Sequence, residues 1–308
     1  MMPWAPGERF AGHRYVSDVL ETLLDAGEIR YALRAYCTQL LDDVPDPLHT
    51  QLQPVAAYVG GKCMGYPAVW FLERLLAPEG ISVASILERC GTALCVSLTT
   101  SIVDDLSDGD EAIDSAYLAY LYVLIAKIAF DVPQIERQNS RARDLLYRAL
   151  DACLNPHAKI TSASVVRRGD RIGGFYRMIA ADTLVELWPE DRAAIAIEAI
   201  GEFGEVCAHI DDWMDAERDL ERGVMGNAVL LLLAQQLGRA PSVHDLFEHR
   251  AELLTTLTAV LTSKLTALRV PISLDDILAK LSATLAAITP AAASPTIPPR
   301  VHARAVCI

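Results

Sequence analysis

The feature that most constrains this chain is a column of carboxylates on a predicted helix. Asp211, Asp215 and Asp219 recur every four residues, so on an α-helix they fall within roughly 80° of one another along roughly 12 Å. Like charges at this spacing destabilise a helix by roughly 0.2–0.5 kcal/mol per pair. The column therefore either faces bulk water or has a functional role. The preceding stretch, Ile195 to Cys207, is largely apolar, which favours a column that faces a cleft.

A second acidic cluster, formed by Asp104, Asp105 and Asp108, ends another apolar helical run that we expect from Ala84 to Val103. Two apolar helices that end in carboxylates predict two walls of one site. Carboxylate oxygens suit Mg²⁺, which keeps several waters and bridges a few carboxylates to substrate phosphates. For either motif alone, a plain solvated helix remains an open alternative.

The composition predicts an all-α fold. Hydrophobic residues make up 52% of the 308 residues and aromatic residues only 6%, with few alternating β-branched runs. We expect one helical bundle of about ten to thirteen helices. Residues 1–289 form this single domain, and the Pro/Ala-rich tail 290–308 is predicted to be disordered. Helices are expected near residues 15–41, 47–59, 68–76, 112–129, 136–153, 228–237, 243–250, 253–268 and 274–288, with a split near Asp131-Val132-Pro133.

Charge and cysteine usage narrow the possible partners and the compartment. The net charge of −13 argues against nucleic acid and anionic membranes, because both need basic surfaces. The seven cysteines show no Cys-x-x-Cys spacing, so we expect small buried thiols in a reducing compartment. No signal peptide or membrane-spanning stretch is evident, so a soluble cytoplasmic protein is expected.

Two basic segments interrupt the helical pattern beside glycines. Gly60-Gly61-Lys62 predicts a break that binds an anion through backbone N–H groups and one lysine, or a simple interhelical turn. Arg167, Arg168 and Arg171 precede Gly173-Gly174, and Arg167 and Arg171 are one turn apart, a spacing suited to gripping a diphosphate. A surface basic patch is the alternative. The glycine pair itself indicates a kink, a close approach or a site.

Four motifs in this order resemble those of the isoprenoid synthase superfamily. The four are Gly60-Gly61-Lys62 with Pro67, Asp104-Asp105-Leu106-Ser107-Asp108, Arg171-Ile172-Gly173-Gly174-Phe175, and Ile210-Asp211-Asp212-Trp213-Met214-Asp215. They are similar to the glycine-rich motif, the first aspartate-rich motif, the Lys-Thr-Gly-type segment and the second aspartate-rich motif of trans-prenyl diphosphate synthases. The resemblance covers about Gly60 to Gly223.

The resemblance implies a helical bundle around a central cavity, a diphosphate site built around three Mg²⁺ ions, and a homodimeric enzyme. The implied metal ligands are Asp104, Asp105, Asp108, Asp211, Asp212, Asp215 and Asp219. The implied diphosphate-binding residues are Lys62, Arg167, Arg168, Arg171 and Arg218. Mg²⁺ and arginines stabilise the charge that develops on a leaving diphosphate.

Departures from the family pattern indicate which kind of enzyme in the superfamily this chain resembles. Chain-elongating members carry arginines that grip isopentenyl diphosphate, whereas this chain has Cys63, Gly65 and the acidic segment Asp110 to Asp114 in those places. The resemblance therefore favours a class I terpene synthase, a lyase acting on a diterpene-type prenyl diphosphate that is linear or already cyclised. A short-chain trans-prenyltransferase and a non-catalytic partner of a prenyl synthase are the alternatives.

Under this reading, an apolar pocket would hold the carbocation away from water. The candidate wall residues are Trp70, Phe71, Ser97, Ser101, Phe175, Tyr176, Cys207 and His209. Apolar residues at helical spacing are also what a plain core contains, and that alternative stays open. For Trp213, within the second aspartate motif, the sequence fits a side chain that faces the pocket and one that faces away from it.

Overall fold

A computed structural model describes residues 16–108, 115–138, 162–223 and 227–288. Within these ranges, the side chains of residues 103–108, 129–138, 162–171 and 222 lie outside the description. Every regular element in the described ranges is helical, with thirteen α-helices, one 3-10 turn and no strand. The predicted all-α class is confirmed. The central cavity and the domain limits remain predictions.

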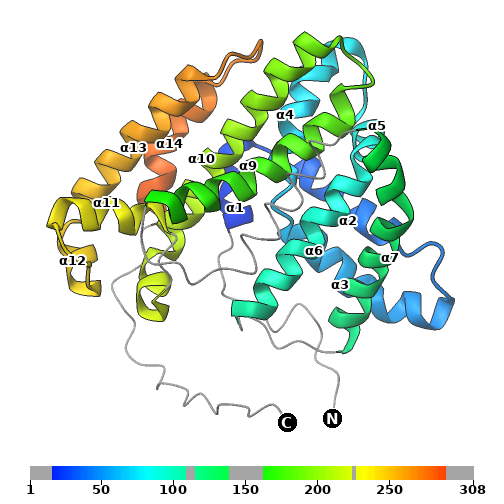
Figure 1. Ribbon diagram of the computed structural model, residues 1–308, viewed down its shortest axis with the longest axis horizontal. Helices are drawn as coiled ribbons and strands as arrows, with labels where there is room; N and C mark the ends of the chain where they lie inside the picture. The colour runs from blue at the N-terminus through cyan, green and yellow to red at the C-terminus, as the bar shows by residue number, and fades with distance from the viewer. Residues whose placement is uncertain (1–15, 109–114, 139–161, 224–226, 289–308) are drawn as a thin grey trace.

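The helices pack as a bundle (Figure 1). One core of buried apolar side chains lies between them. The first half contains α1 (Val16–Leu24), α2 (Gly27–Gln39), α3 (Asp46–Lys62), α4 (Tyr66–Leu76), η1 (Ala77–Glu79), α5 (Val83–Arg89), α6 (Gly91–Asp108) and α7 (Ser115–Gln138). The second half contains α9 (Ser162–Leu184), α10 (Glu190–Arg222), α11 (Ala228–Leu237), α12 (Val243–Glu248), α13 (Arg250–Ala267) and α14 (Asp275–Ala287).

Two predicted helix boundaries are wrong. The run from Ala84 to Val103 is divided at Cys90 into α5 and α6, because the Asp182 carboxylate from α9 accepts the Ala93 N–H and caps the first turn of α6. Conversely, α7 continues through Pro133, where a split was expected. A proline removes one backbone hydrogen bond, a loss that tertiary packing of a helix can offset, and α7 as a whole packs against α3 and α6. The helix expected at 136–153 falls mostly outside the described residues.

The glycine pair in Gly60-Gly61-Lys62 does not form a loop. Both glycines lie inside α3, and they are buried. A Cβ on Gly60 would lie 2.9 Å from Cys37 Sγ, so the missing side chain lets α3 approach α2 closely. The expected break comes later, between Cys63 and Gly65, just before α4.

Among the described helices, α9 and α10 form the most extensive contact, and they run antiparallel. The two helices touch at glycines. A Cβ on Gly173 would lie 2.8 Å from the Gly201 carbonyl oxygen, and a Cβ on Gly204 would lie 3.1 Å from Gly173 Cα. Of the three readings of the glycine pair, close approach is the one observed, since α9 runs unbroken through it.

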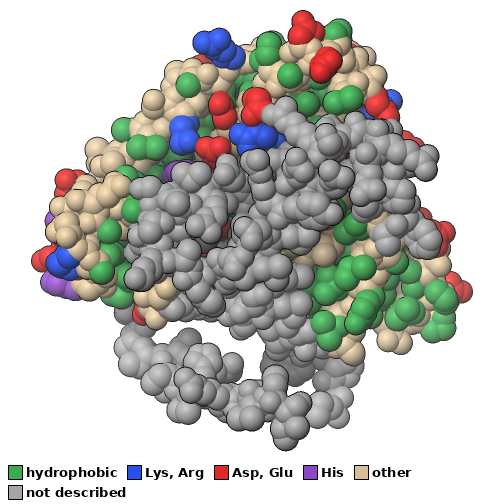
Figure 2. Space-filling model, viewed as in Figure 1, with side chains coloured by type: hydrophobic (Ala, Val, Ile, Leu, Met, Phe, Trp, Pro, Cys, Tyr) green, Lys and Arg blue, Asp and Glu red, His purple; other side chains and the backbone are tan. Residues whose placement is uncertain are grey.

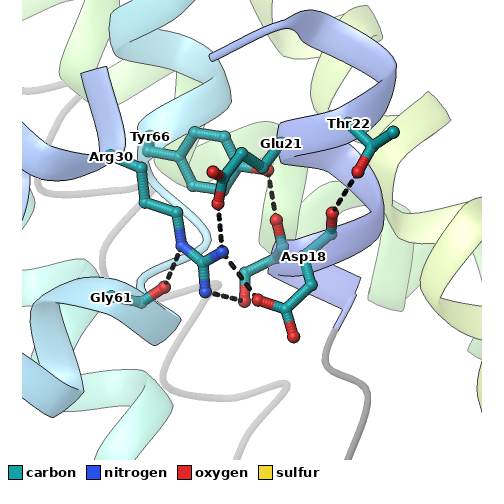
Figure 3. Close-up of polar contacts among 7 residues, drawn as sticks. Asp18, Glu21, Thr22, Arg30, Gly61 and Tyr66 are labelled. Atoms are coloured by element: carbon teal, nitrogen blue, oxygen red, sulfur yellow. Dashed lines mark hydrogen bonds and ion pairs between the residues drawn. The ribbon is translucent and has the colours of Figure 1, made fainter. Parts of the chain in front are cut away.

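A buried arginine on α2 joins the first four helices (Figure 3). The guanidinium of Arg30 donates to the Gly61 carbonyl oxygen at 2.6 Å, to Asp18 Oδ1 at 2.6 Å, to Glu21 and to Ser17 Oγ at 3.1 Å. Tyr66 of α4 donates its hydroxyl to the Ser17 carbonyl oxygen at 2.8 Å. Each of the three guanidinium nitrogens of this buried cation therefore donates to a structural partner.

The two ends of the described chain meet. α1 packs against α14, and Trp213 of α10 donates its indole N–H to the Leu285 carbonyl oxygen at 3.1 Å. Trp213 therefore points toward α14. Ile277, Leu281 and Leu285 bury the inner face of α14.

The five cysteines in the described residues are free thiols and all are buried, as expected. They are Cys37, Cys63, Cys90, Cys95 and Cys207. Cys153 and Cys307 lie outside the described residues. Among the helices described, none combines the length and the apolarity that crossing a bilayer requires.

Candidate functional site

The acidic column lies on the C-terminal half of α10, and its members differ in exposure. Asp211 and Asp215 are half-buried, whereas Asp219 is 5% exposed and Asp212, on another face of the helix, is 2% exposed. Asp211 and Asp215 thus present carboxylates one turn apart at the surface of the bundle. Asp212 and Asp219 point into it.

The two buried aspartates hold the N-terminus of α11. Asn227 donates its Nδ2 to Asp219 Oδ2 at 2.9 Å and to the Asp212 carbonyl oxygen at 2.7 Å. The Ala228 N–H donates to Asp212 Oδ2 at 2.9 Å. Asn227 Oδ1 accepts from the N–H groups of Val229 and Leu230, so the same side chain caps α11. Asp212 and Asp219 therefore have structural contacts, beside the metal-binding role that the resemblance implies.

Arg218, an expected diphosphate ligand, forms an ion pair on α10. Its Nη2 lies 2.5 Å from Asp215 Oδ2, and both side chains are partly exposed. An exposed pair of this kind contributes about 0–1 kcal/mol, so an incoming diphosphate or cation can displace it at little cost.

The other acidic motif and the predicted arginines lie on backbone that approaches the same end of the bundle. In Figure 1, α6 and α10 run so that their C-terminal ends point to the same side, and α9 begins beside the C-terminal half of α10. Asp104, Asp105 and Asp108 fall in the last turns of α6, and Arg167, Arg168 and Arg171 in the first half of α9. The side chains of these six residues lie outside the description.

The glycine contacts fix the register of α9 on α10. Gly173 lies against Gly201 and Gly204, and the helices are antiparallel. Position 167 lies six residues before Gly173 on α9. Because the helices are antiparallel, it is level with the positions six residues after Gly201 and Gly204 on α10, which are 207 and 210. The arginine-bearing turns of α9 therefore run beside the part of α10 that leads into Asp211.

The described residues contain no group of three or more His, Cys, Asp or Glu side chains placed to hold a metal ion by themselves. Asp211 and Asp215 offer two hard oxygen donor groups one turn apart on one face of α10. Such a pair fits Mg²⁺, which keeps waters and takes its remaining ligands from substrate phosphates, and does not fit a metal that needs a complete protein cage. The predicted second wall, on α6, lies outside the described side chains.

Lys62 ends α3 and is half-buried. The guanidinium of Arg34, one turn after Arg30 on α2, lies over the preceding Gly61: a Cβ on Gly61 would be 2.5 Å from Arg34 Nε. Arg34 is exposed. Sequence reasoning missed Arg34, because α2 and α3 meet only in the folded chain.

The predicted aromatic wall residues belong to one cluster. Trp70 and Phe71 of α4 pack on Phe203 of α10, with ring centroids 6.0 and 5.2 Å from that of Phe203. Trp70 is 5% exposed, and its indole N–H has no hydrogen-bond acceptor within the described part of the chain. Phe203 was not predicted, although it lies two turns before Asp211.

Tyr176 of α9 lies beside Cys207 of α10, below the acidic column. Burial and the neighbouring Cys207 thiol raise the pKa of the Tyr176 phenol. Burial also raises the pKa of Cys207 to about 12, and the nearby Asp211 carboxylate adds to that effect. Both side chains are therefore neutral at physiological pH.

The other predicted wall residues are spread over the interior. Ser97 is buried beside the Cys63 thiol, and Ser101 donates to the Ser97 carbonyl oxygen at 3.0 Å. Phe175 is 7% exposed, and His209 is half-buried with Nδ1 2.6 Å from the Glu205 carbonyl oxygen. Trp70, Phe71, Phe175, Tyr176 and Cys207 all belong to the continuous core. The plain-core alternative fits these positions, and the pocket stays a prediction.

A charged cluster that the sequence did not reveal lies where α9 crosses α10. Arg177 Nε donates to Glu198 at 2.9 Å, and its Nη2 lies 3.7 Å from Glu205, which also accepts from Lys264 of α13 at 3.1 Å. The Arg177 side chain fills the space over Gly201. The sequence signal for this cluster is Gly201, which lies three residues after Glu198 and four residues before Glu205.

No protein-family model, curated protein or solved structure matches this chain. The resemblance to isoprenoid synthases therefore rests on the four motifs alone.

Proposed function

We propose that the protein is a class I terpene synthase that ionises an allylic prenyl diphosphate and converts the carbocation into a cyclic or rearranged terpene, a diterpene above all. The observation that carries the proposal is the register of α9 on α10. It brings the turns that hold Arg167 beside the approach to Asp211, at the end of the bundle to which the acidic end of α6 also points.

The proposed roles follow from charge and position. Asp211 and Asp215, with Asp104, Asp105 and Asp108 from α6, would hold Mg²⁺ ions, which neutralise the substrate diphosphate when bound. Arg167, Arg168, Arg171 and Arg218, with Lys62, would stabilise the leaving diphosphate. The allylic carbon–oxygen bond breaks, and its electron pair leaves with the diphosphate oxygen. The apolar interior keeps the cation from water until it cyclises and loses a proton as an alkene forms.

Product analysis tests the proposal directly. Purified protein with Mg²⁺ is incubated with geranylgeranyl, farnesyl or copalyl-type diphosphate, each with and without isopentenyl diphosphate. A hydrocarbon or terpene alcohol formed without isopentenyl diphosphate is the expected result. A longer prenyl diphosphate formed only in its presence would overturn the lyase assignment.

Site variants separate an enzyme from a non-catalytic partner. Asp104→Asn and Asp211→Asn should each lower kcat/KM by at least about a hundredfold. Each change weakens the binding of a Mg²⁺ ion that would neutralise the charge developing on the diphosphate in the transition state. Glu202→Gln is the matched control, since Glu202 is an exposed carboxylate on the same helix as Asp211. Equal activity of the wild type, the two aspartate variants and the control would show that neither aspartate belongs to the active site.

A short-chain trans-prenyltransferase is the second candidate, and Arg34 favours it. Elongating enzymes need a cation beside the glycine-rich motif for a second diphosphate, and Arg34 lies over Gly61 next to Lys62. If this candidate holds, Arg34→Gln raises the KM for isopentenyl diphosphate and leaves that for the allylic diphosphate unchanged. If the protein is a lyase, Arg34→Gln has no effect on product formation.

We further propose a cytoplasmic location, supported by the five buried free thiols, which suit a reducing compartment. Fractionation of the source cells, with a cytoplasmic and a secreted marker, tests this location.

A further inference from the structure

A largely apolar hollow lies between the C-terminal half of α10 and the short helix α12 (Figure 1). Its volume is about 280 Å³, counting the part that is open to solvent. Pockets for small molecules usually measure about 300–1,000 Å³, so this hollow suits a short stretch of peptide better than a whole metabolite. We refer to it as the α10–α12 groove. Its walls are Trp213, Ala216, Glu217, Leu246, Phe247 and Arg250.

The α12 wall of the groove is held in place by polar contacts at the start of that helix. The Asp245 carboxylate accepts from the Arg239 guanidinium at 2.6 and 2.8 Å and from the Ser242 N–H at 2.8 Å. Phe247, two residues later, is 37% exposed, whereas Trp213 on the opposite wall is 3% exposed. The groove is therefore formed before anything binds in it, with an aromatic side chain on each wall.

The described chain ends beside this groove. Trp213 donates its indole N–H to the Leu285 carbonyl oxygen at 3.1 Å, so the last turn of α14 contacts a side chain that lines the groove. Ile288, the last described residue, is buried in the core. The twenty residues that follow, 289–308, lie outside the described structure. They begin one turn from the Trp213 contact, and at about 3.3 Å per residue a few of them reach into the groove.

The sequence of this tail suits an aromatic groove. It contains Ile297-Pro298-Pro299-Arg300-Val301, and a proline pair favours the extended polyproline conformation, which docks on aromatic surfaces. The tail lacks helical periodicity, and an extended segment of this kind needs none. Proline has no N–H, so the pair can cover Trp213 and Phe247 without burying an unpaired donor.

The charge of the tail is opposite to that of the protein. Residues 289–308 include Arg300 and Arg304 and no acidic side chain, whereas the chain as a whole has a net charge of −13. Figure 2 shows acidic side chains beside hydrophobic ones at the edge of the molecule where α12 lies. Within the groove, Glu217 is the acidic residue, and Arg250 lies near it. A tail that binds there would bring Arg300 to Glu217.

We infer that residues 297–301 of the C-terminal tail bind in the α10–α12 groove of the same chain. A tethered segment has an effective concentration on the order of millimolar, so it fills even a weak site, and a separate proline-rich peptide has to compete with it. The bound tail ties α12 to α10 and α14. Trp213 is about 200° of helix rotation from Asp211, so the tail leaves the acidic column open.

Limited digestion of the full chain with trypsin tests the inference, because trypsin cleaves after Arg300 and a bound segment is cut only while it is released. Mass spectrometry follows the rate of this cleavage in the protein and in a synthetic peptide of residues 289–308. Cleavage should be at least about tenfold slower in the protein than in the free peptide. The same slowing should appear at every protein concentration, since the contact lies within one chain.

Variants on both sides of the contact locate it. Phe247→Ser removes the exposed wall of the groove and should bring the cleavage rate to within about threefold of that of the free peptide. Tyr31→Ser is the matched control: Tyr31 is an aromatic residue 74% exposed on α2, and its replacement should leave the protection unchanged. Ile297→Asp lies outside the described helices, so it serves if Phe247→Ser does not fold. It should also abolish protection, measured against a free peptide with the same change.

Four results would overturn the inference. Cleavage after Arg300 as fast as in the free peptide would leave the groove to a separate partner. Protection that survives Phe247→Ser or Ile297→Asp would place the tail elsewhere, and equal acceleration by Tyr31→Ser would show a general loosening of the protein. Protection lost on dilution would mean that the tail binds another molecule. The digestion needs neither substrate nor Mg²⁺, so its outcome is independent of the proposed terpene synthase activity.

Discussion

At the scale of single residues, Asn227 decides what two of the predicted metal ligands do. Its amide nitrogen donates to Asp219 and to the backbone of Asp212, while its amide oxygen caps α11. A side chain with both a donor and an acceptor is needed there, since one side of it faces a buried carboxylate and the other faces backbone N–H groups.

The variant Asn227→Asp should destabilise the fold more than Asn227→Ser. Both keep an oxygen for the cap, but aspartate brings a second buried carboxylate against Asp219. We expect losses of about 3–5 kcal/mol for Asn227→Asp and about 1–2 kcal/mol for Asn227→Ser in the free energy of unfolding at pH 7. Urea denaturation measures both. Equal losses would mean that the contact with Asp219 contributes nothing.

Asp182 makes stability depend on pH. Burial raises its pKa from 3.8 to about 7, against the favourable hydrogen bond from Ala93, with Glu186 adding to the rise. The folded state therefore binds the proton more tightly than the unfolded state does. The stabilisation that comes from protonated Asp182 should be fully present below about pH 4. As the pH rises from about 4 to about 7 this stabilisation is lost, and the free energy of unfolding should fall by up to about 4 kcal/mol.

The variant Asp182→Asn should remove this slope. Asparagine can still accept the Ala93 N–H but carries no charge, so the variant should be more stable than the wild type at pH 8 and close to it at pH 4. Thermal unfolding between pH 4 and pH 8 makes the comparison. A constant difference between the two proteins across that range would show that Asp182 does not titrate there.

At the scale of helices, glycine positions explain the tightest packing. Gly173→Ala places a methyl group 2.8 Å from the Gly201 carbonyl oxygen, which is backbone and cannot turn aside. We expect a loss of about 1–3 kcal/mol by chemical denaturation. Gly27→Ala is the matched control: its nearest neighbour would be a flexible Glu21 oxygen at 3.4 Å, and the change should be neutral or stabilising by up to about 1 kcal/mol. Equal effects would refute the close approach.

Helices were predictable from the sequence where the residues of the helix itself determine where it begins and ends. Apolar periodicity predicted most of them, and the Gly173-Gly174 pair indicated the close approach of α9 and α10. The division at Cys90 was not predictable, because the cap of α6 comes from Asp182, about ninety residues away in sequence. The candidate site shows the same limit. Spacing predicted the face shared by Asp211 and Asp215, whereas the contact of Asp219 with Asn227 and that of Arg34 with Gly61 required the fold.

At the scale of the whole molecule, the last helix completes the core. α14 buries Ile277, Leu281 and Leu285, each worth roughly 1.5–3 kcal/mol of hydrophobic stabilisation. Their sum is comparable to the total stability of a domain, about 5–15 kcal/mol.

A chain that ends at Ser273 should therefore lose cooperative unfolding, while one that ends at Ile288 keeps every described contact of α14. Thermal unfolding followed by near- and far-ultraviolet circular dichroism compares the two. A sharp transition in the shorter chain, within a few degrees of the longer one, would show that α14 is dispensable.

The contact between α1 and α14 has a consequence during protein synthesis. The ribosome makes α1 first and α14 last of the described helices, so the part of α1 that packs on α14 stays uncovered until α14 has been translated, although α2 and α4 cover other parts of α1 earlier. Contacts between segments so distant in sequence form slowly, because a long loop must close first. The docking of α14 on α1 is thus among the last packing steps of the described bundle as the chain is made, and the uncovered part of α1 is where a chaperone would bind the growing chain.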